Sequence, residues 1–153
     1  MELVKYKTMQ GDSRIPQLIK ESCYCSTQDG MNSPKRIVSA MKEVFQIHRE
    51  TEEYLYEICM DAKGKPMAIF EISHGTVNSS LISPREYYQK ALLVGAVATV
   101  VVHNHPSGDC VPSREDEKMT ARLNEAGKLM GIQLVDSIVI GNEYYSFAEC
   151  DRL

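Results

Sequence analysis

Two histidines at the end of an apolar run constrain the fold of this chain more than any other feature. The run extends from Val97 to Val102 and leads directly into His103 and His105. Residues i and i+2 of a strand project from the same face of a sheet, so both imidazoles converge if the strand continues through the pair. We therefore expect a buried strand that presents two nitrogen ligands at its carboxyl end.

A turn and a helix follow the histidines and supply a carboxylate. Residues 106–109, Pro-Ser-Gly-Asp, are typical of a turn. Ser113 begins an apolar-periodic helical stretch with Asp116 in its first turn, so the loop can fold this carboxylate back over the histidines. Two histidines and one carboxylate leave a tetrahedral Zn²⁺ ion with an open fourth position, the arrangement of catalytic zinc sites.

Ser113 and Asp116 also have a purely architectural interpretation. The spacing Ser-x-x-Asp is close to a capping box, and an acidic residue in the first turn suits the helix dipole. A histidine pair at a strand end is by itself more often structural than metal-binding. A cap alone would not require two histidines just upstream, so the combination favours a metal site.

The string from His103 to Asp116 contains the His-x-His and Ser-x-x-Asp pattern of the JAB/MPN superfamily of metalloproteases, also called JAMM. Together with residues 75–78 (Gly-Thr-Val-Asn) and 84–86 (Pro-Arg-Glu), it resembles the RadC family, whose members are commonly labelled DNA repair proteins. The resemblance extends from about residue 33 to the C-terminus. It implies an α/β (α+β) fold of the JAB/MPN type, a cytidine-deaminase-like mixed β-sheet flanked by helices.

The resemblance also implies a role for each residue of the pattern. His103, His105 and Asp116 would bind the zinc ion, with a water molecule completing the coordination shell. Ser113 would stabilise an oxyanion or orient that water. The implied chemistry is hydrolysis of a peptide or isopeptide bond by zinc-activated water.

Relatives of this type also use an upstream glutamate as general base and acid. Glu53 stands at the start of a predicted strand, residues 54–60, as the catalytic acid of the family does after its first helix. Glu71 is the second candidate and lies among apolar residues of the next predicted strand, residues 67–72. We prefer Glu53 for its place between helix and strand.

Two further segments bear on substrate binding. Asp136 and Ser137 stand where family members usually carry an Asp-His pair, and this departure can alter a contact around the site. Residues 75–80 lie near the substrate path in a JAB-type fold. They either bind the substrate backbone or form a polar loop between a strand and a helix.

The remaining patterns predict a mixed sheet flanked by three helices. Ser-Pro pairs begin helices at residues 33 and 83, where Glu86 would complete a capping box, and a third helix extends from Ser113 to Gly131. Strands are expected at 54–60, 67–72, 97–102, 133–140 and 144–147, with hairpin connections at 61–65 and 141–142. Residues 1–32 have loop chemistry and predict an N-terminal arm or extension, ahead of a domain at 33–153.

Charge and composition narrow the function. A formal charge of −4 and a pI near 5.6 argue against direct nucleic-acid binding and against a nuclease, since both normally present a basic surface. Five cysteines without a C-x-x-C pair indicate reduced thiols, and no apolar stretch resembles a membrane span or a signal peptide. We expect a cytoplasmic zinc hydrolase acting on a peptide or isopeptide-linked protein, away from membranes. An exposed edge strand or the N-terminal arm could support a homodimer.

The alternative function is a non-catalytic zinc-binding scaffold in a DNA repair or replication-associated complex. Superfamily members that serve as scaffolds lack the full ligand set. This chain has all three expected ligands, which favours the enzyme.

Overall fold

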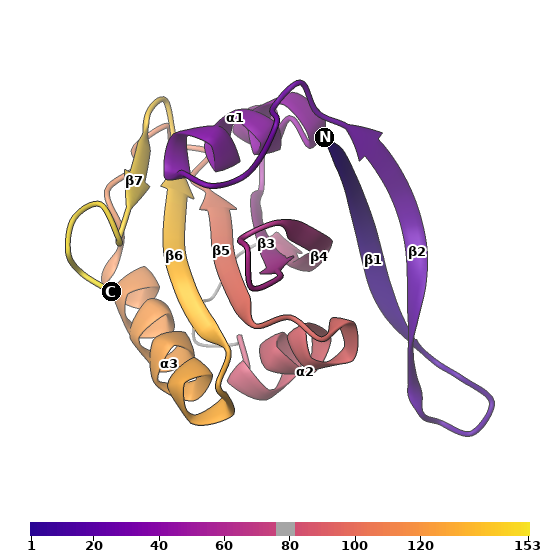
Figure 1. The fold of residues 1–153 in the computed structure, drawn as a ribbon. Helices are drawn as coiled ribbons and strands as arrows, with labels where there is room; N and C mark the ends of the chain where they lie inside the picture. The colour runs from indigo at the N-terminus through magenta and orange to yellow at the C-terminus, as the bar shows by residue number, and fades with distance from the viewer. Residues whose placement is uncertain (76–81) are drawn as a thin grey trace.

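A seven-stranded mixed sheet forms the centre of the computed structural model, which describes residues 1–75 and 82–153 (Figure 1). The order of its strands is β2-β1-β4-β3-β5-β6-β7. Its strands are β1 (Glu2–Gln10), β2 (Pro16–Cys25), β3 (Glu53–Met60), β4 (Pro66–Gly75), β5 (Ala98–Asn104), β6 (Gln133–Ile140) and β7 (Tyr144–Ser146). The helices are α1 (Pro34–Val44), the short 3₁₀ helix η1 (Ile47–Arg49), α2 (Pro84–Val94) and α3 (Arg114–Met130). The mixed α/β fold predicted from the sequence is thus confirmed.

The sheet is covered by α1 on one face and by α2 and α3 on the other. Along β5, Val100 and Val102 pack in the cluster that contains α1. Val101 instead packs with residues of α2 and α3. Because side chains alternate along a strand, His103 projects on the same face as Val101, toward α3. The strand alternation therefore fixes the face on which the histidine lies.

The helices begin close to where the Ser-Pro and Ser-x-x-Asp patterns predict. The backbone N–H of Arg36 donates to Ser33 Oγ at 3.4 Å, which caps α1. Ser83 precedes Pro84 at the start of α2, but within the described ranges its side chain makes no capping hydrogen bond, so the capping box expected there with Glu86 is wrong.

The N-terminal residues are more ordered than their loop chemistry suggests. Strands β1 and β2 form an antiparallel hairpin whose turn end projects away from the rest of the molecule (Figure 1). The hairpin joins the sheet where Lys5 and Tyr6 of β1 pair in parallel with Ile69 and Phe70 of β4. Most of its side chains are partly or fully exposed, so the strands lack the apolar alternation by which strands are predicted. The domain boundary after residue 32 stays a prediction.

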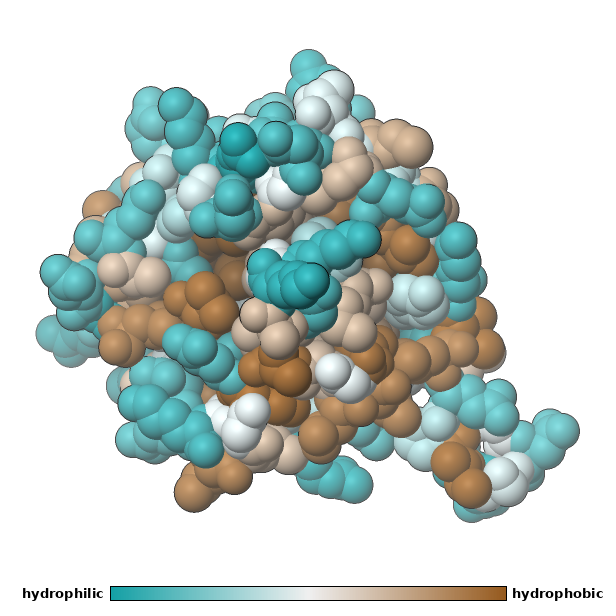
Figure 2. Space-filling model, viewed as in Figure 1, coloured by the Kyte–Doolittle hydropathy of each residue, from teal (hydrophilic) through white to brown (hydrophobic). Residues whose placement is uncertain are grey.

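The surface divides into polar and apolar regions. In the view of Figure 2, apolar residues gather on the lower part of the molecule, over α2, and polar residues dominate above. Leu92, Leu93 and Met130, at the carboxyl ends of α2 and α3, are among the exposed apolar side chains. In the described part of the chain, no helix is both long and apolar enough to span a membrane.

Candidate metal centre

The two histidines lie at the point where β5 leaves the sheet. His103 pairs with Leu55 of β3 and is buried, with 1% of its surface exposed. The backbone N–H of His105 donates to the carbonyl of Ile140 in β6 at 2.8 Å, which continues the parallel pairing of β5 with β6 by one residue. The Nε2 atoms of the two rings are 3.2 Å apart. The predicted convergence of the two imidazoles is thus present.

The first turn of α3 brings Asp116 to the histidines. Its Oδ2 atom accepts hydrogen bonds from the backbone N–H of Ser113 at 2.7 Å and from Ser113 Oγ at 2.6 Å. The N–H of Asp116 donates in return to Ser113 Oγ at 3.1 Å, which completes a capping box. Oδ1 takes no part in the cap and lies 3.2 Å from His103 Nε2. The cap thus orients the carboxylate toward the histidines.

The distances between the three donors fit a tetrahedral ion. His103 Nε2 is 3.2 Å from both His105 Nε2 and Asp116 Oδ1, and Asp116 Oδ2 is 3.4 Å from His105 Nε2. A tetrahedral zinc ion with ordinary bond lengths separates its ligand atoms by about 3.3 to 3.4 Å. The three residues therefore bring their ligand atoms close enough together to hold a metal ion.

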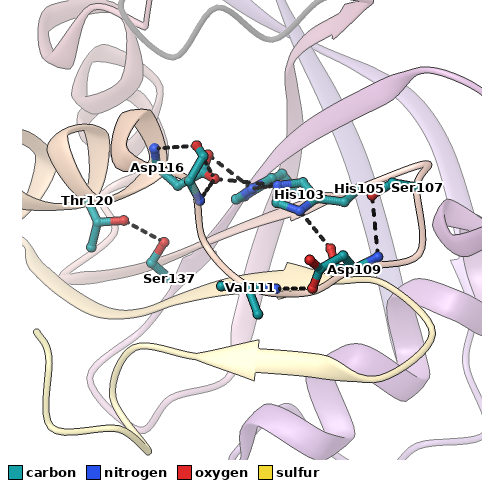
Figure 3. A network of polar contacts seen from close by, with 9 residues as sticks. His103, His105, Ser107, Asp109, Val111, Asp116, Thr120 and Ser137 are labelled. Carbon is teal, nitrogen blue, oxygen red and sulfur yellow. Dashed lines mark hydrogen bonds and ion pairs between the residues drawn. The ribbon is translucent and has the colours of Figure 1, made fainter.

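The loop after β5 fixes the orientation of the second histidine. The carbonyl of Asp109 accepts a hydrogen bond from His105 Nδ1 at 2.8 Å, which places the proton on Nδ1 and directs the Nε2 lone pair to the site (Figure 3). Ser107 and Val111 bond to Asp109 and brace the loop. Nδ1 of His103 is buried and has no hydrogen-bond partner within the described residues.

Hydrogen bonds determine the charge of the carboxylate. Burial alone would raise the pKa of Asp116, but the hydrogen bonds to His103 and His105 bring it well below the usual range. The same interaction with Asp116 raises the pKa of His105. The site therefore offers an ionised carboxylate beside the two imidazoles.

The strand register separates the two candidate glutamates. Glu53 is two residues before Leu55, so it lies on the face of the sheet that carries His103, and extending the register sets it opposite His105. Glu71 pairs with Tyr56, which packs on the α1 face, and its carboxylate binds Lys5 at 2.8 Å. Of the two candidates, Glu53 is thus the one on the face of the sheet that carries His103.

One further buried residue of this region has no role predicted from the sequence. Asn104, between the two histidines, is 1% exposed and bonds through its side chain to the backbone at the start of β3. A buried amide directly between two candidate ligands is the signal that could have drawn attention to it.

Asp136 and Ser137 stand where family members usually carry an Asp-His pair, and both side chains make hydrogen bonds within the fold. Ser137 is buried and its Oγ atom accepts a hydrogen bond from Thr120, one turn after Asp116 in α3, at 2.8 Å (Figure 3). Asp136 bonds to Ser146 and to the backbone of Ala148. Of the segment expected near the substrate path, residues 76–80 lie outside the described part of the chain.

Comparison with known proteins identifies similar chains. Residues 31–152 match the family model described as RadC-like JAB domain. A UPF0758 protein of Geotalea uraniireducens is 40% identical over 118 residues, which cover 76% of this chain and 51% of the relative. A UPF0758 protein of Clostridium perfringens is 40% identical over 128 residues, 83% of this chain and 56% of the relative. A third, from Methanosarcina barkeri, is 36% identical over 120 residues, 75% of this chain and 52% of the relative. The chain thus spans about half the length of the curated relatives it matches.

Proposed function

The chain belongs to the family of RadC-like JAB domains, and from this we propose that it is a JAMM-type zinc-dependent hydrolase that cleaves a peptide or isopeptide bond. The observation that carries the proposal is the convergence of His103, His105 and Asp116 at the separations of a tetrahedral ion. Three protein ligands leave one position open for water or substrate, as in catalytic zinc sites.

A bound zinc ion would polarise a carbonyl group and lower the pKa of water to about 7. Glu53 would accept a proton from the attacking water and deliver it to the leaving amine, since its carboxylate shares the face of the sheet with the triad. Glu71 is unsuited to this role because Lys5 and His74 engage it on the opposite face.

Ser113 has one role in this proposal and a second that requires movement. Its hydroxyl donates to Asp116 Oδ2 and so holds the carboxylate toward the histidines. To stabilise an oxyanion, as the resemblance implies, the hydroxyl would have to exchange this hydrogen bond for one to the substrate. The oxyanion role stays a prediction.

The alternative is a non-catalytic zinc-binding scaffold in a DNA repair or replication-associated complex. A scaffold has no need of an open coordination position or of a carboxylate at Glu53, so the arrangement favours the enzyme. The acidic balance of the chain supports a protein or peptide substrate over direct binding of nucleic acid.

The test begins with metal content, measured by plasma mass spectrometry on untagged protein. One zinc per chain is expected, with loss of zinc in His103→Ala, His105→Ala and Asp116→Ala. Peptide and isopeptide substrates would then be screened with Glu53→Gln as the inactive variant and Glu71→Gln as its matched control. Protein that takes up no zinc would refute the proposal, and zinc-loaded protein without hydrolysis would favour the scaffold.

A further inference from the structure

The β3–β5 pairing ends just before the candidate base, and this raises the question of what holds Glu53 in place. The last regular pair of the antiparallel ladder is Leu55 with His103. Two residues later, the N–H of His105 bonds to Ile140 of β6. Regular pairing of β3 with β5 thus stops short of Glu53, which pairs on its other side with Gly75 of β4.

The side chain of Asn104 makes hydrogen bonds to β3 and to the residue before it. Asn104 Nδ2 donates to the carbonyl of Glu52 at 3.0 Å, and Asn104 Oδ1 accepts from the N–H of Tyr54 at 2.7 Å. One donor and one acceptor on a planar amide are what a peptide group offers in a sheet. The amide therefore replaces a peptide group and extends the ladder past the end of the backbone pairing.

We propose that Asn104 is a positioning residue for Glu53, whose backbone it clamps on both sides so that the carboxylate faces the metal-binding triad. The inference rests on the proposed function, because it gives Glu53 a purpose at that position. Asn104 is also flanked in sequence by His103 and His105. One short segment therefore provides the two histidines and positions Glu53. Its burial excludes water that would compete for the two hydrogen bonds.

The chemistry of the clamp requires an amide. Aspartate at position 104 would keep the acceptor for the Tyr54 N–H but would bring a second acceptor against the carbonyl of Glu52. Alanine would remove both bonds and leave the start of β3 held only by its pairing with β4, so that this strand end frays more readily. Neither change touches a metal ligand, so the metal should remain while the carboxylate loses its orientation.

The experiment compares Co²⁺-loaded wild type, Asn104→Ala, Asn104→Asp, Glu53→Gln and the double variant Asn104→Ala/Glu53→Gln. The readouts are metal content and the visible absorption spectrum across pH. A matched control is Tyr88→Phe, which removes a buried hydrogen bond of 2.8 Å to Leu123. That bond lies about 10 Å along α3 from Asp116.

All variants should bind one metal ion. The pH midpoint of the change in the Co²⁺ spectrum should move by about one pH unit in both Asn104 variants and in Glu53→Gln. This corresponds to a tenfold change, the lower end of the roughly 10- to 100-fold effects seen when residues that support a metal site are lost. The double variant should add nothing, and Tyr88→Phe should keep the wild-type spectrum.

Two results would overturn the positioning role while leaving the hydrolase standing. One is a wild-type spectrum in Asn104→Ala or Glu53→Gln with full metal content, and the other is additive shifts in the double variant. A wild type that binds no metal would refute the proposed function itself, and the inference with it.

Discussion

Glu57 is a buried acid in the apolar layer between the sheet and α2, and its ionisation is expected to limit the stability of the protein at higher pH. Its side chain is fully buried, and within the described residues neither carboxylate oxygen has a hydrogen-bond partner. Burial raises the pKa of Glu57 well above its usual value, and the charge of Lys90 offsets only part of this. The folded protein therefore keeps the proton of Glu57 to a higher pH than the unfolded chain does.

The sign and size of the effect follow from proton linkage. Because the folded pKa of Glu57 is raised, its contribution to stability is complete below the unfolded value, near 4.5, and is lost as pH rises through the folded pKa. Between these limits the unfolded state releases a proton that the folded state keeps. The free energy of unfolding should thus fall by about 1.4 kcal/mol per pH unit from this group.

Glu57→Gln tests this reasoning, because the amide is close in shape to the protonated acid and does not titrate. Urea unfolding of metal-free protein between pH 5 and 8 should show the difference in stability between the variant and wild type changing by about 1.4 kcal/mol per pH unit in favour of the variant. Glu125→Gln, at an exposed position of α3, serves as the control and should parallel wild type. Parallel pH profiles for Glu57→Gln and wild type would refute the argument.

Three further substitutions probe how the site is held. Gly141→Ala would set a Cβ 2.3 Å from the backbone oxygen of Gly108 and so displace the loop whose Asp109 carbonyl orients His105. Chelator competition should show metal binding weakened by roughly 10- to 100-fold. Unchanged metal affinity would contradict this expectation. Ser113→Ala removes the cap of α3, so thermal unfolding should register a loss of about 1 kcal/mol and chelator competition a weaker metal site. Ser33→Ala removes the equivalent cap of α1, on the other face of the sheet, and should cost a similar ~1 kcal/mol with no change in metal affinity; a parallel loss of metal would show that the effect of Ser113→Ala is not local.

The sheet centre and the helix starts could be predicted because their signals are local. The apolar run before His103 becomes β5, and the Ser-Pro pairs stand at the starts of α1 and α2. The apolar periodicity of the first helix extends from Ile37 to Ile47, but α1 ends at Val44 and Ile47 belongs to η1. Apolar periodicity continues through such a break, because a buried side chain is needed on that face in either conformation.

The hairpin of β1 and β2 was missed for the opposite reason. A ribbon that contacts the sheet over only a short stretch buries few side chains, so its sequence has little apolar alternation to detect. The contacts of Asn104 could not be predicted from the sequence because they depend on strand pairing. The backbone atoms that it bonds belong to Glu52 and Tyr54, some fifty positions earlier in the chain, and only the β3–β5 register brings them together.

The two interpretations of Ser113 and Asp116 turn out to be compatible. A capping box engages one carboxylate oxygen, and here Oδ2 of Asp116 receives both hydrogen bonds from Ser113. Oδ1 remains outside the cap at 3.2 Å from His103 Nε2. The helix start thus orients the carboxylate before any ion binds. Metal binding therefore loses less conformational entropy, because the side chain is already ordered. The capping spacing is therefore compatible with the candidate metal site, because it brings the carboxylate to the two histidines.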